Sequence, residues 1–272
     1  MTEQTLHTCT LLGYELLNSY PGIVHFVTTR SGGCSKGTYD SLNLTPYTGD
    51  DPAHVAENRS RLCRALGIEE SRLILPYQTH STHLMNIDAD FLTLSEEEQH
   101  AKLQGVDGVI TALTDICVCV STADCIPILM YDREHQVVAA VHAGWRGTVQ
   151  KIAVLALQKM GALFGTRADQ LLVGFGPGIS QEAFEVGPEV FDSFKTAGFP
   201  MAHITQWHSG SGKYHINLWE ANRWQLLQAG VPDSQMECAG LCSWKNEEKL
   251  FSARRLGIKS GRTLSGIMMR KN

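Results

Sequence analysis

The chain has 272 residues, of which 43% are hydrophobic and 19% are charged, and its formal net charge at pH 7 is −5. This length and hydrophobic content allow a full core and exclude a disordered chain. The negative balance excludes a generally basic nucleic-acid binder, so we expect no nucleic-acid partner.

Eight cysteines are dispersed along the chain and do not form a tight disulfide framework. The N-terminus lacks a basic segment followed by an apolar one, so no signal peptide is predicted. The most apolar run, Ile116 to Tyr131, contains Asp124 and is too short to span a bilayer. We therefore expect a cytoplasmic protein with no membrane partner, whose cysteines are free or bound to metal.

Two helices are predicted in the first 110 residues. Asp51-Pro52 opens a helical segment that ends at Gly67, with proline at its first position and glycine after its last turn. Ser95 and Glu98 have capping-box spacing and predict a short exposed helix, in the one stretch that resembles a linker.

The rest of the chain alternates short apolar runs with amphipathic segments. We expect Thr148 to cap a helix that places Ile152, Leu155, Ala156 and Met160 on one face. Two more helices are predicted over Pro188–Ala197 and Leu218–Ala229, each followed by a glycine. The runs that predict strands are Val109–Thr111, Ile116–Ser121, Ile126–Tyr131, Val137–His142, Leu171–Phe175 and Leu264–Met269. Because strands and helices mix without a clean βαβ alternation, we predict an α+β (mixed α/β) layered fold in one domain, residues 1–272.

Three potential metal ligands follow or end apolar runs: His80, Cys125 and His142. Catalytic zinc sites use three nitrogen or sulfur ligands and leave a fourth position open. Two other interpretations stay open, a Cys125 that is a small core residue and a Cys125 nucleophile with His142 as its base. Cys117 and Cys119 are expected on opposite faces of a strand, and hence not as a chelating pair.

Glycine-rich turns beside arginines suggest an anionic ligand. His142-Ala143-Gly144-Trp145-Arg146-Gly147-Thr148 leads into a helix whose N-terminus would suit phosphate. Arg30 precedes a Ser-Gly-Gly turn, and Arg254 lies in an arginine pair near the C-terminus. Tight turns without a ligand and a solvated arginine face are the alternatives. No His-x-His pair occurs, which argues against a multicopper oxidase, and the zinc deaminase signature is absent.

Taken together, these segments resemble one known family from about Arg30 to the C-terminus. It is the YfiH-like family, variously labelled multicopper polyphenol oxidase, laccase-domain protein, purine nucleoside phosphorylase and peptidoglycan editing factor. The most specific motifs are Thr122-Ala123-Asp124-Cys125 and His142-Ala143-Gly144-Trp145-Arg146-Gly147-Thr148, accompanied by Ser41-Leu42-Asn43-Leu44, Gln78-Thr79-His80, Asp107-Gly108-Val109-Ile110-Thr111, Phe184-Glu185-Val186-Gly187, Phe251-Ser252-Ala253-Arg254-Arg255 and Gly261-Arg262.

The resemblance implies a single α/β/β/α layered domain with mixed sheets, and zinc held by His80, Cys125 and His142, with copper as the other metal. Two segments depart from the family pattern. Gln78-Thr79-His80 stands where many members have Gln-Val-His, and Ser252-Ala253-Arg254-Arg255-Leu256-Gly257 replaces the commoner Ser-Tyr-Arg-Arg-Asp-Gly.

The function implied by the resemblance is zinc-dependent phosphorolysis of adenosine, inosine and methylthioadenosine, with some adenosine deamination. His80, Cys125 and His142 would then be catalytic, and Arg30, Arg146 and Arg254 would hold phosphate. Glu185 and Asn43 are candidates for ribose or base contacts. Asp124 either orients a metal ligand or is a turn residue, and both interpretations stay open. The partners would be a nucleoside and phosphate, and the protein a monomer or small homo-oligomer. The alternatives are a zinc amidase that edits peptidoglycan precursors, a copper-dependent polyphenol oxidase, and a partner-binding module with a structural zinc.

Overall fold

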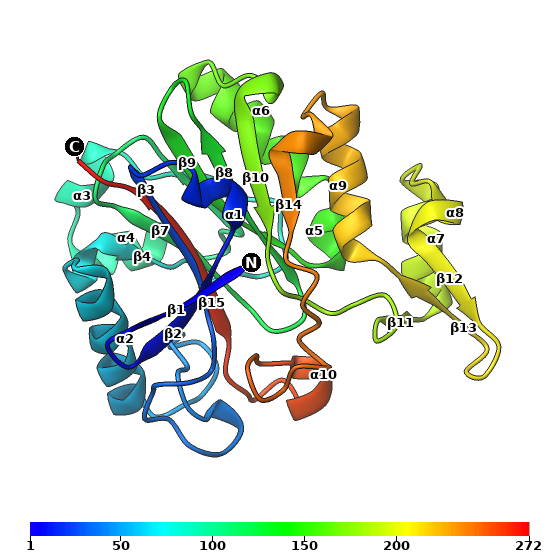
Figure 1. Cartoon of the computed structure of the whole chain (residues 1–272), viewed down its shortest axis with the longest axis horizontal. Helices are drawn as coiled ribbons and strands as arrows, with labels where there is room; N and C mark the ends of the chain where they lie inside the picture. The colour runs from blue at the N-terminus through cyan, green and yellow to red at the C-terminus, as the bar shows by residue number, and fades with distance from the viewer. Residues whose placement is uncertain (272) are drawn as a thin grey trace.

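The computed structural model describes residues 1–271, whose strands form two six-stranded sheets and a smaller three-stranded one (Figure 1). The first sheet has the order β1 (Thr2–Leu6), β2 (Cys9–Gly13), β3 (Ile23–Thr28), β15 (Thr263–Met269), β7 (Cys117–Thr122) and β4 (Leu73–Ile74). The second has the order β14 (Met236–Cys238), β10 (Leu171–Phe175), β8 (Ile126–Asp132), β9 (Val137–Ala143), β6 (Gly108–Thr111) and β5 (Leu84–Asn86). The small sheet, β11 (Glu185–Val186), β13 (Lys213–Ile216) and β12 (Thr205–His208), lies at one edge of the molecule.

Both large sheets are mixed, because their inner strands are antiparallel and edge strands add parallel pairs. β4 runs parallel to β7, β14 to β10 and β5 to β6. The helices are α1 (Glu15–Asn18), α2 (Pro52–Leu66), α3 (Ala89–Thr93), α4 (Glu96–Lys102), α5 (Trp145–Val149), α6 (Ile152–Phe164), α7 (Pro188–Thr196), α8 (Met201–Ile204), α9 (Leu218–Gln228) and α10 (Ala253–Leu256).

The molecule has four layers of helices and sheets, and its buried hydrophobic residues form three clusters between these layers. Leu62 and Leu66 of α2 pack with residues such as Phe26 on the outer face of the first sheet. The facing surfaces of the two large sheets form a second cluster, and α6 and α9 pack on the outer face of the second sheet to form a third. This order of layers confirms the expected α/β/β/α arrangement. It also explains the apolar run of β8 before Asp132. Both faces of this sheet are covered, so alternate residues of the run enter two different clusters.

Most predicted elements are present at nearly the predicted bounds. The helix expected between Asp51 and Gly67 is α2: the Asp51 side chain accepts a hydrogen bond from the Ala53 N–H (2.8 Å), and Gly67 ends the helix in the left-handed region at φ 63°. The capping box of Ser95 and Glu98 is also confirmed, at the start of α4. The six strands predicted from apolar runs correspond to β6, β7, β8, β9, β10 and β15.

Two local predictions are wrong. Thr148 does not cap the long helix: it is buried inside the short α5, and α6 begins after Lys151, which takes a left-handed φ of 64°. Cys117 and Cys119 lie on the same face of β7, with their sulfur atoms 3.6 Å apart, because residues two apart on a strand share a face. Both belong to the core under α2, and all eight cysteines are free. Within residues 1–271, no helix combines the length and the apolar character needed to cross a bilayer.

Candidate metal centre

Strand pairing brings Cys125 and His142 together. Cys125 immediately precedes β8 and His142 is the second-last residue of β9, and these antiparallel strands pair Ile126 with Ala143. His80 arrives from the loop between β4 of the first sheet and β5 of the second, so the group lies where the two sheets meet.

The three side chains form a compact donor set. One ligand atom from each side chain lies within 4.8 Å of the others. Among the described residues, these three form the group of His, Cys, Asp or Glu side chains that is close enough to share a metal ion. The Cys125 sulfur is 3.8 Å from His80 Nε2, and the two histidine rings lie 4.9 Å apart, centroid to centroid. The 3.8 Å between the sulfur and the nitrogen suits two donors that each bind a common zinc ion at about 2.0–2.3 Å. The residues present therefore fit the metal that the resemblance implies.

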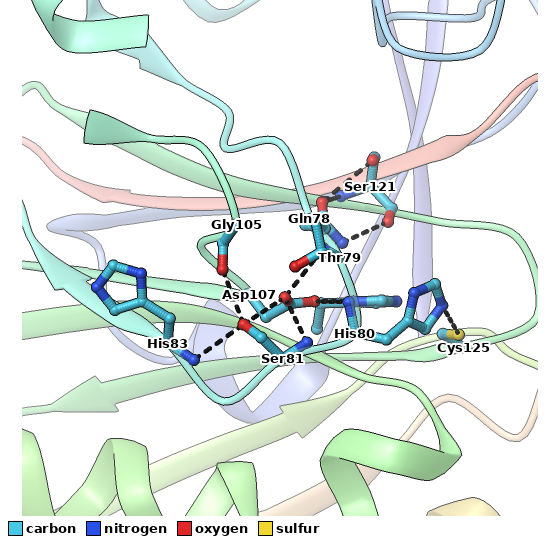
Figure 2. Close-up of polar contacts among 10 residues, drawn as sticks. Gln78, Thr79, His80, Ser81, His83, Gly105, Asp107, Ser121 and Cys125 are labelled. Atoms are coloured by element: carbon cyan, nitrogen blue, oxygen red, sulfur yellow. Dashed lines mark hydrogen bonds and ion pairs between the residues drawn. The ribbon is translucent and has the colours of Figure 1, made fainter. Parts of the chain in front are cut away.

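Asp107, for which the sequence predicts no role, organises this group (Figure 2). One of its carboxylate oxygens accepts from His142 Nδ1–H (2.7 Å) and from the His80 N–H (3.0 Å). The other accepts from the Thr79 N–H (3.0 Å), the Ser81 N–H (2.8 Å) and the Ser81 hydroxyl (2.8 Å). Because the carboxylate accepts the Nδ1 proton, Nε2 is the unprotonated nitrogen of the neutral His142 ring and is free to bind a metal. A signal existed in the sequence, because Asp107 is an acidic residue directly before a buried strand.

The Asp124 carboxylate, in contrast, forms no hydrogen bond with the side chains of the donor set. Its two carboxylate oxygens accept from the Ser243 hydroxyl (2.7 Å) and the Arg254 N–H (2.7 Å), so it holds the C-terminal segment near the site. The Gln78 side chain ties the His80 loop to β7, because it both accepts from the Ser121 N–H (2.7 Å) and donates to the Ser121 carbonyl (2.9 Å) (Figure 2).

The charges of the three groups are coupled. Burial opposes ionisation of Cys125, but the charge of His142 and hydrogen bonds from His142 and His80 lower the pKa of its thiol to about 6. Burial likewise opposes the charged form of His142, but the Cys125 charge and the Asp107 hydrogen bond raise its pKa to about 9. Burial would raise the pKa of Asp107, yet its bonds to His142, Ser81 and Thr79 lower it to about 2. The thiolate, which is the form that binds metals and attacks electrophiles, is therefore favoured near neutral pH.

Gly144 lies against the donor set. A Cβ atom at this position would come within 2.9 Å of the Cys125 sulfur and 3.0 Å of His80 Cδ2. Because Gly144 has an ordinary φ of −70°, the need for glycine here is one of space and not of backbone conformation.

The donor set opens into a cavity of about 390 Å³. Its other lining includes the aromatic rings of Tyr47 and Tyr77 and two cations, Lys259 and Arg262. Ala253, in one of the two segments that depart from the family pattern, also lines it. A larger cavity of about 500 Å³, between α6 and α9, has neither histidine nor cysteine in its lining, so the smaller cavity is the candidate site.

The five predicted substrate contacts lie outside the lining of this cavity. Arg30 donates to the carbonyl oxygens of Asp40 and Glu247 (both 2.6 Å), and Asn43 is buried and donates to Asp50 (2.9 Å). Arg146 is exposed and lies over the Trp145 ring. Glu185 pairs with Lys213 (2.7 Å), and Arg254 donates to the Glu185 carbonyl (3.3 Å). The structure thus brings the three candidate metal ligands together and places these five residues elsewhere, and their roles in substrate binding stay predictions.

The fold and the His-Cys-His group define an α/β/β/α protein with a candidate metal centre between its two sheets. The family model described as multi-copper polyphenol oxidoreductase laccase matches residues 24–270, and the chain belongs to this family. It is 48% identical over 261 residues to a purine nucleoside phosphorylase of Bacteroides thetaiotaomicron, covering 96% of this chain and 97% of that one. It is 42% identical to adenosine deaminase RL5 of an unknown prokaryotic organism, covering 93% and 96%. Among solved structures, a hypothetical protein YfiH of Bacillus licheniformis superposes with a TM-score of 0.87 at 26% identity, over 97% of each chain, which confirms the YfiH-like resemblance.

Proposed function

We propose that this protein is a zinc-dependent purine nucleoside phosphorylase that acts on adenosine, inosine and methylthioadenosine. The observation that carries the proposal is the His80, Cys125 and His142 donor set, with His142 oriented by the buried Asp107. The 48% identity to a relative named purine nucleoside phosphorylase supports the choice of reaction.

The reaction exchanges one bond for another. The bond between the purine nitrogen and ribose C1′ breaks, a bond between a phosphate oxygen and C1′ forms, and the proton of hydrogen phosphate leaves with the base. Zinc in the donor set would supply a Lewis acid with an open coordination position. Asp107 keeps the Nδ1 proton of His142 in place, so that Nε2 stays available to the metal.

The cavity wall suits a planar base. Tyr47 and Tyr77 meet edge to face with ring centroids 4.8 Å apart, and they are 37% and 38% exposed. Because both rings are partly exposed, they can pack against a purine without losing contacts in the hydrophobic core. Thr48, Ser121 and Thr122 also line the cavity, and hydroxyl side chains of this type can form hydrogen bonds with a ribose.

A second activity, adenosine deamination, is favoured by the 42% identity to a relative named adenosine deaminase. The same donor set would serve it, because activating water needs the same Lewis acid. The competing mechanism without metal is a Cys125 nucleophile with His142 and Asp107 as its partners. In that mechanism His80, 3.8 Å from the sulfur, would stabilise the thiolate and would not be a metal ligand.

The deciding experiment is product analysis of purified protein of measured zinc content, incubated with adenosine with and without phosphate. We expect adenine and ribose 1-phosphate only when phosphate is present, in proportion to bound zinc. Inosine as the sole product would shift the assignment to a deaminase. Absence of turnover on all three nucleosides by zinc-loaded protein would overturn the proposal and favour the peptidoglycan amidase, and polyphenol turnover only after copper loading would favour the oxidase.

Cys125→Ala tests whether zinc retention and turnover depend on the same residue, and removal of zinc from the wild type separates the metal mechanism from the nucleophile mechanism. We expect Cys125→Ala to lose zinc and turnover together, whereas Cys238→Ser, at an exposed cysteine of β14, should keep both. Phosphorolysis by the wild-type protein after complete removal of zinc would contradict the zinc mechanism.

A further inference from the structure

Arg262 carries a charge that no acidic side chain neutralises. It directly precedes β15, its side chain lines the metal cavity, and no carboxylate in residues 1–271 forms an ion pair with it. Its four side-chain hydrogen bonds all go to neutral oxygens of the preceding turn. Nη1 donates to the Ser260 carbonyl (2.7 Å), the Ser260 hydroxyl (3.2 Å) and the Gly261 carbonyl (3.0 Å), and Nη2 donates to the Ile258 carbonyl (3.0 Å).

These bonds leave a defined pair of donors free. A guanidinium has five N–H groups, and the contacts of Arg262 use those of Nη1 and one of Nη2. The Nε hydrogen and one Nη2 hydrogen have no acceptor among the described residues. Nε and Nη2 lie on one edge of the guanidinium plane, the edge that binds two oxygens of a carboxylate or phosphate at once.

The turn also holds this arginine in place. The Arg262 N–H donates to the side-chain oxygen of Asn43 (3.1 Å), and Asn43 is in turn bonded to Asp50 (2.9 Å). With its backbone fixed and its head group held by carbonyls, the guanidinium loses little freedom when it binds an anion. Asn43, a candidate for substrate contact from the sequence, is therefore a support for Arg262.

The surrounding charges favour an anion. Lys259 lines the same cavity, and no carboxylate of the described chain lines it, so the Cys125 thiolate is the anionic group in its wall. The nearby Asp124 already accepts from Ser243 and Arg254. Burial lowers the pKa of Arg262 in spite of the charges of Cys125 and Asp124, which is the expected effect on a cation that has lost water without gaining a paired anion.

We propose that Arg262, assisted by Lys259, forms the oxyanion subsite of the metal cavity and that its ligand in turnover is inorganic phosphate. This inference rests on the proposed phosphorylase function and assigns the phosphate contact to residues other than Arg30, Arg146 and Arg254. The two free donors of Arg262 bind two phosphate oxygens, and Lys259 adds a mobile charge at the cavity wall.

The test combines a binding measurement with kinetics. Calorimetry of zinc-loaded protein with inorganic phosphate measures the subsite without turnover, and the Michaelis constants for phosphate and adenosine are measured separately. We expect Arg262→Gln to weaken phosphate binding and raise the phosphate KM by about 30-fold or more, because a bidentate charged contact is lost. The adenosine KM and the zinc content should stay within about twofold of the wild type.

Two further variants keep the proposal falsifiable if Arg262→Gln does not fold. Arg262→Lys keeps the charge but not the paired donors, so its phosphate KM should fall between those of the wild type and Arg262→Gln. Lys259→Gln, at an exposed position, should raise the phosphate KM by about 3- to 10-fold. Arg167→Gln, which removes an exposed arginine paired with Asp169, is the matched control and should change neither constant.

The outcomes separate this proposal from the function on which it rests. Phosphate binding that is unchanged in Arg262→Gln, with phosphorolysis intact, overturns the subsite alone. A loss confined to Arg30, Arg146 or Arg254 variants overturns it too and supports the contacts predicted from the sequence. Absence of both phosphate binding and phosphorolysis in the wild type overturns the proposed function and the subsite together.

Discussion

At the scale of single residues, Asp107 has the largest effect on the candidate centre. Its carboxylate accepts five hydrogen bonds, which connect the His80 loop to His142 on β9. Because one buried anion holds both the backbone of the His80 loop and the side chain of His142, its neutral analogue should disturb the centre more than it disturbs the fold.

Asp107→Asn tests this role. An amide at this position presents an NH₂ group to N–H donors, so we expect zinc affinity to fall by about 10- to 100-fold, as for other partners of metal ligands. Competition with a chelator measures the affinity. Asp88→Asn, at the N-cap of α3, is the matched control: it also alters a carboxylate that accepts a backbone N–H (2.9 Å), but it should leave zinc binding unchanged. Equal zinc affinity in the two variants would contradict the role of Asp107.

Gly144→Ala tests the space beside the donor set. The added methyl group would come within 3.0 Å of Cys125 and His80 atoms, so we expect a loss of metal binding with little change in the secondary structure. Zinc content and circular dichroism measure the two effects. Gly210→Ala, where an added Cβ meets nothing within 4 Å, should behave as the wild type.

At the scale of elements, local signals decide where segments begin and end, and packing decides what they cover. α2 begins at an Asp51 cap and ends at Gly67, both readable from the sequence, and it covers the face of the first sheet farther from the second sheet. Thr148 has the same chemistry as a helix cap, but its hydroxyl accepts from Asn222 of α9 (3.0 Å) within the core. A helix cap predicted from the residue type is therefore wrong where the same hydroxyl forms a tertiary hydrogen bond instead.

Gly67→Ala should destabilise the protein by about 1 kcal/mol, because the left-handed conformation is costly for a residue with a Cβ. Gly67→Asn should lose much less, since asparagine tolerates this region. Urea unfolding measures both. Zinc content and turnover of the folded protein should not change, because α2 does not line the cavity; equal stability of the two variants would argue against a conformational cause.

At the scale of the whole molecule, segments distant in sequence complete the first sheet. β15, near the end of the chain, lies between β3 and β7, and His25 on β3 faces the turn that follows β2. The Tyr14 N–H donates to His25 Nε2 (2.8 Å), a contact that requires the neutral ring. Burial lowers the pKa of His25 from its ordinary 6.5 to about 4.

This histidine predicts a loss of stability in mild acid. Between the unfolded pKa of 6.5 and the folded pKa of about 4, the unfolded chain binds the proton more readily, so unfolding becomes easier as the pH falls. Going from pH 7 to pH 5 should cost about 2 kcal/mol through this group. Urea unfolding at both pH values should show that His25→Gln removes this part of the pH dependence, and that His83→Gln, at an exposed histidine, does not. A wild-type slope that persists in His25→Gln would contradict the assignment.

The sequence by itself determined the layered α/β class, most strand and helix bounds, and the three residues of the donor set. Periodicity, caps and apolar runs act over a few neighbours, and a cysteine or histidine shows its metal-binding chemistry wherever it lies. Only the tertiary structure decided that Asp107 and not Asp124 supports the ligands, that Arg262 and Lys259 and not Arg30, Arg146 or Arg254 line the cavity, and that Cys117 and Cys119 are core residues. The reason is physical: the use of a charged side chain depends on which distant segments bury it and which acceptors they bring, and strand pairing across more than a hundred residues sets both.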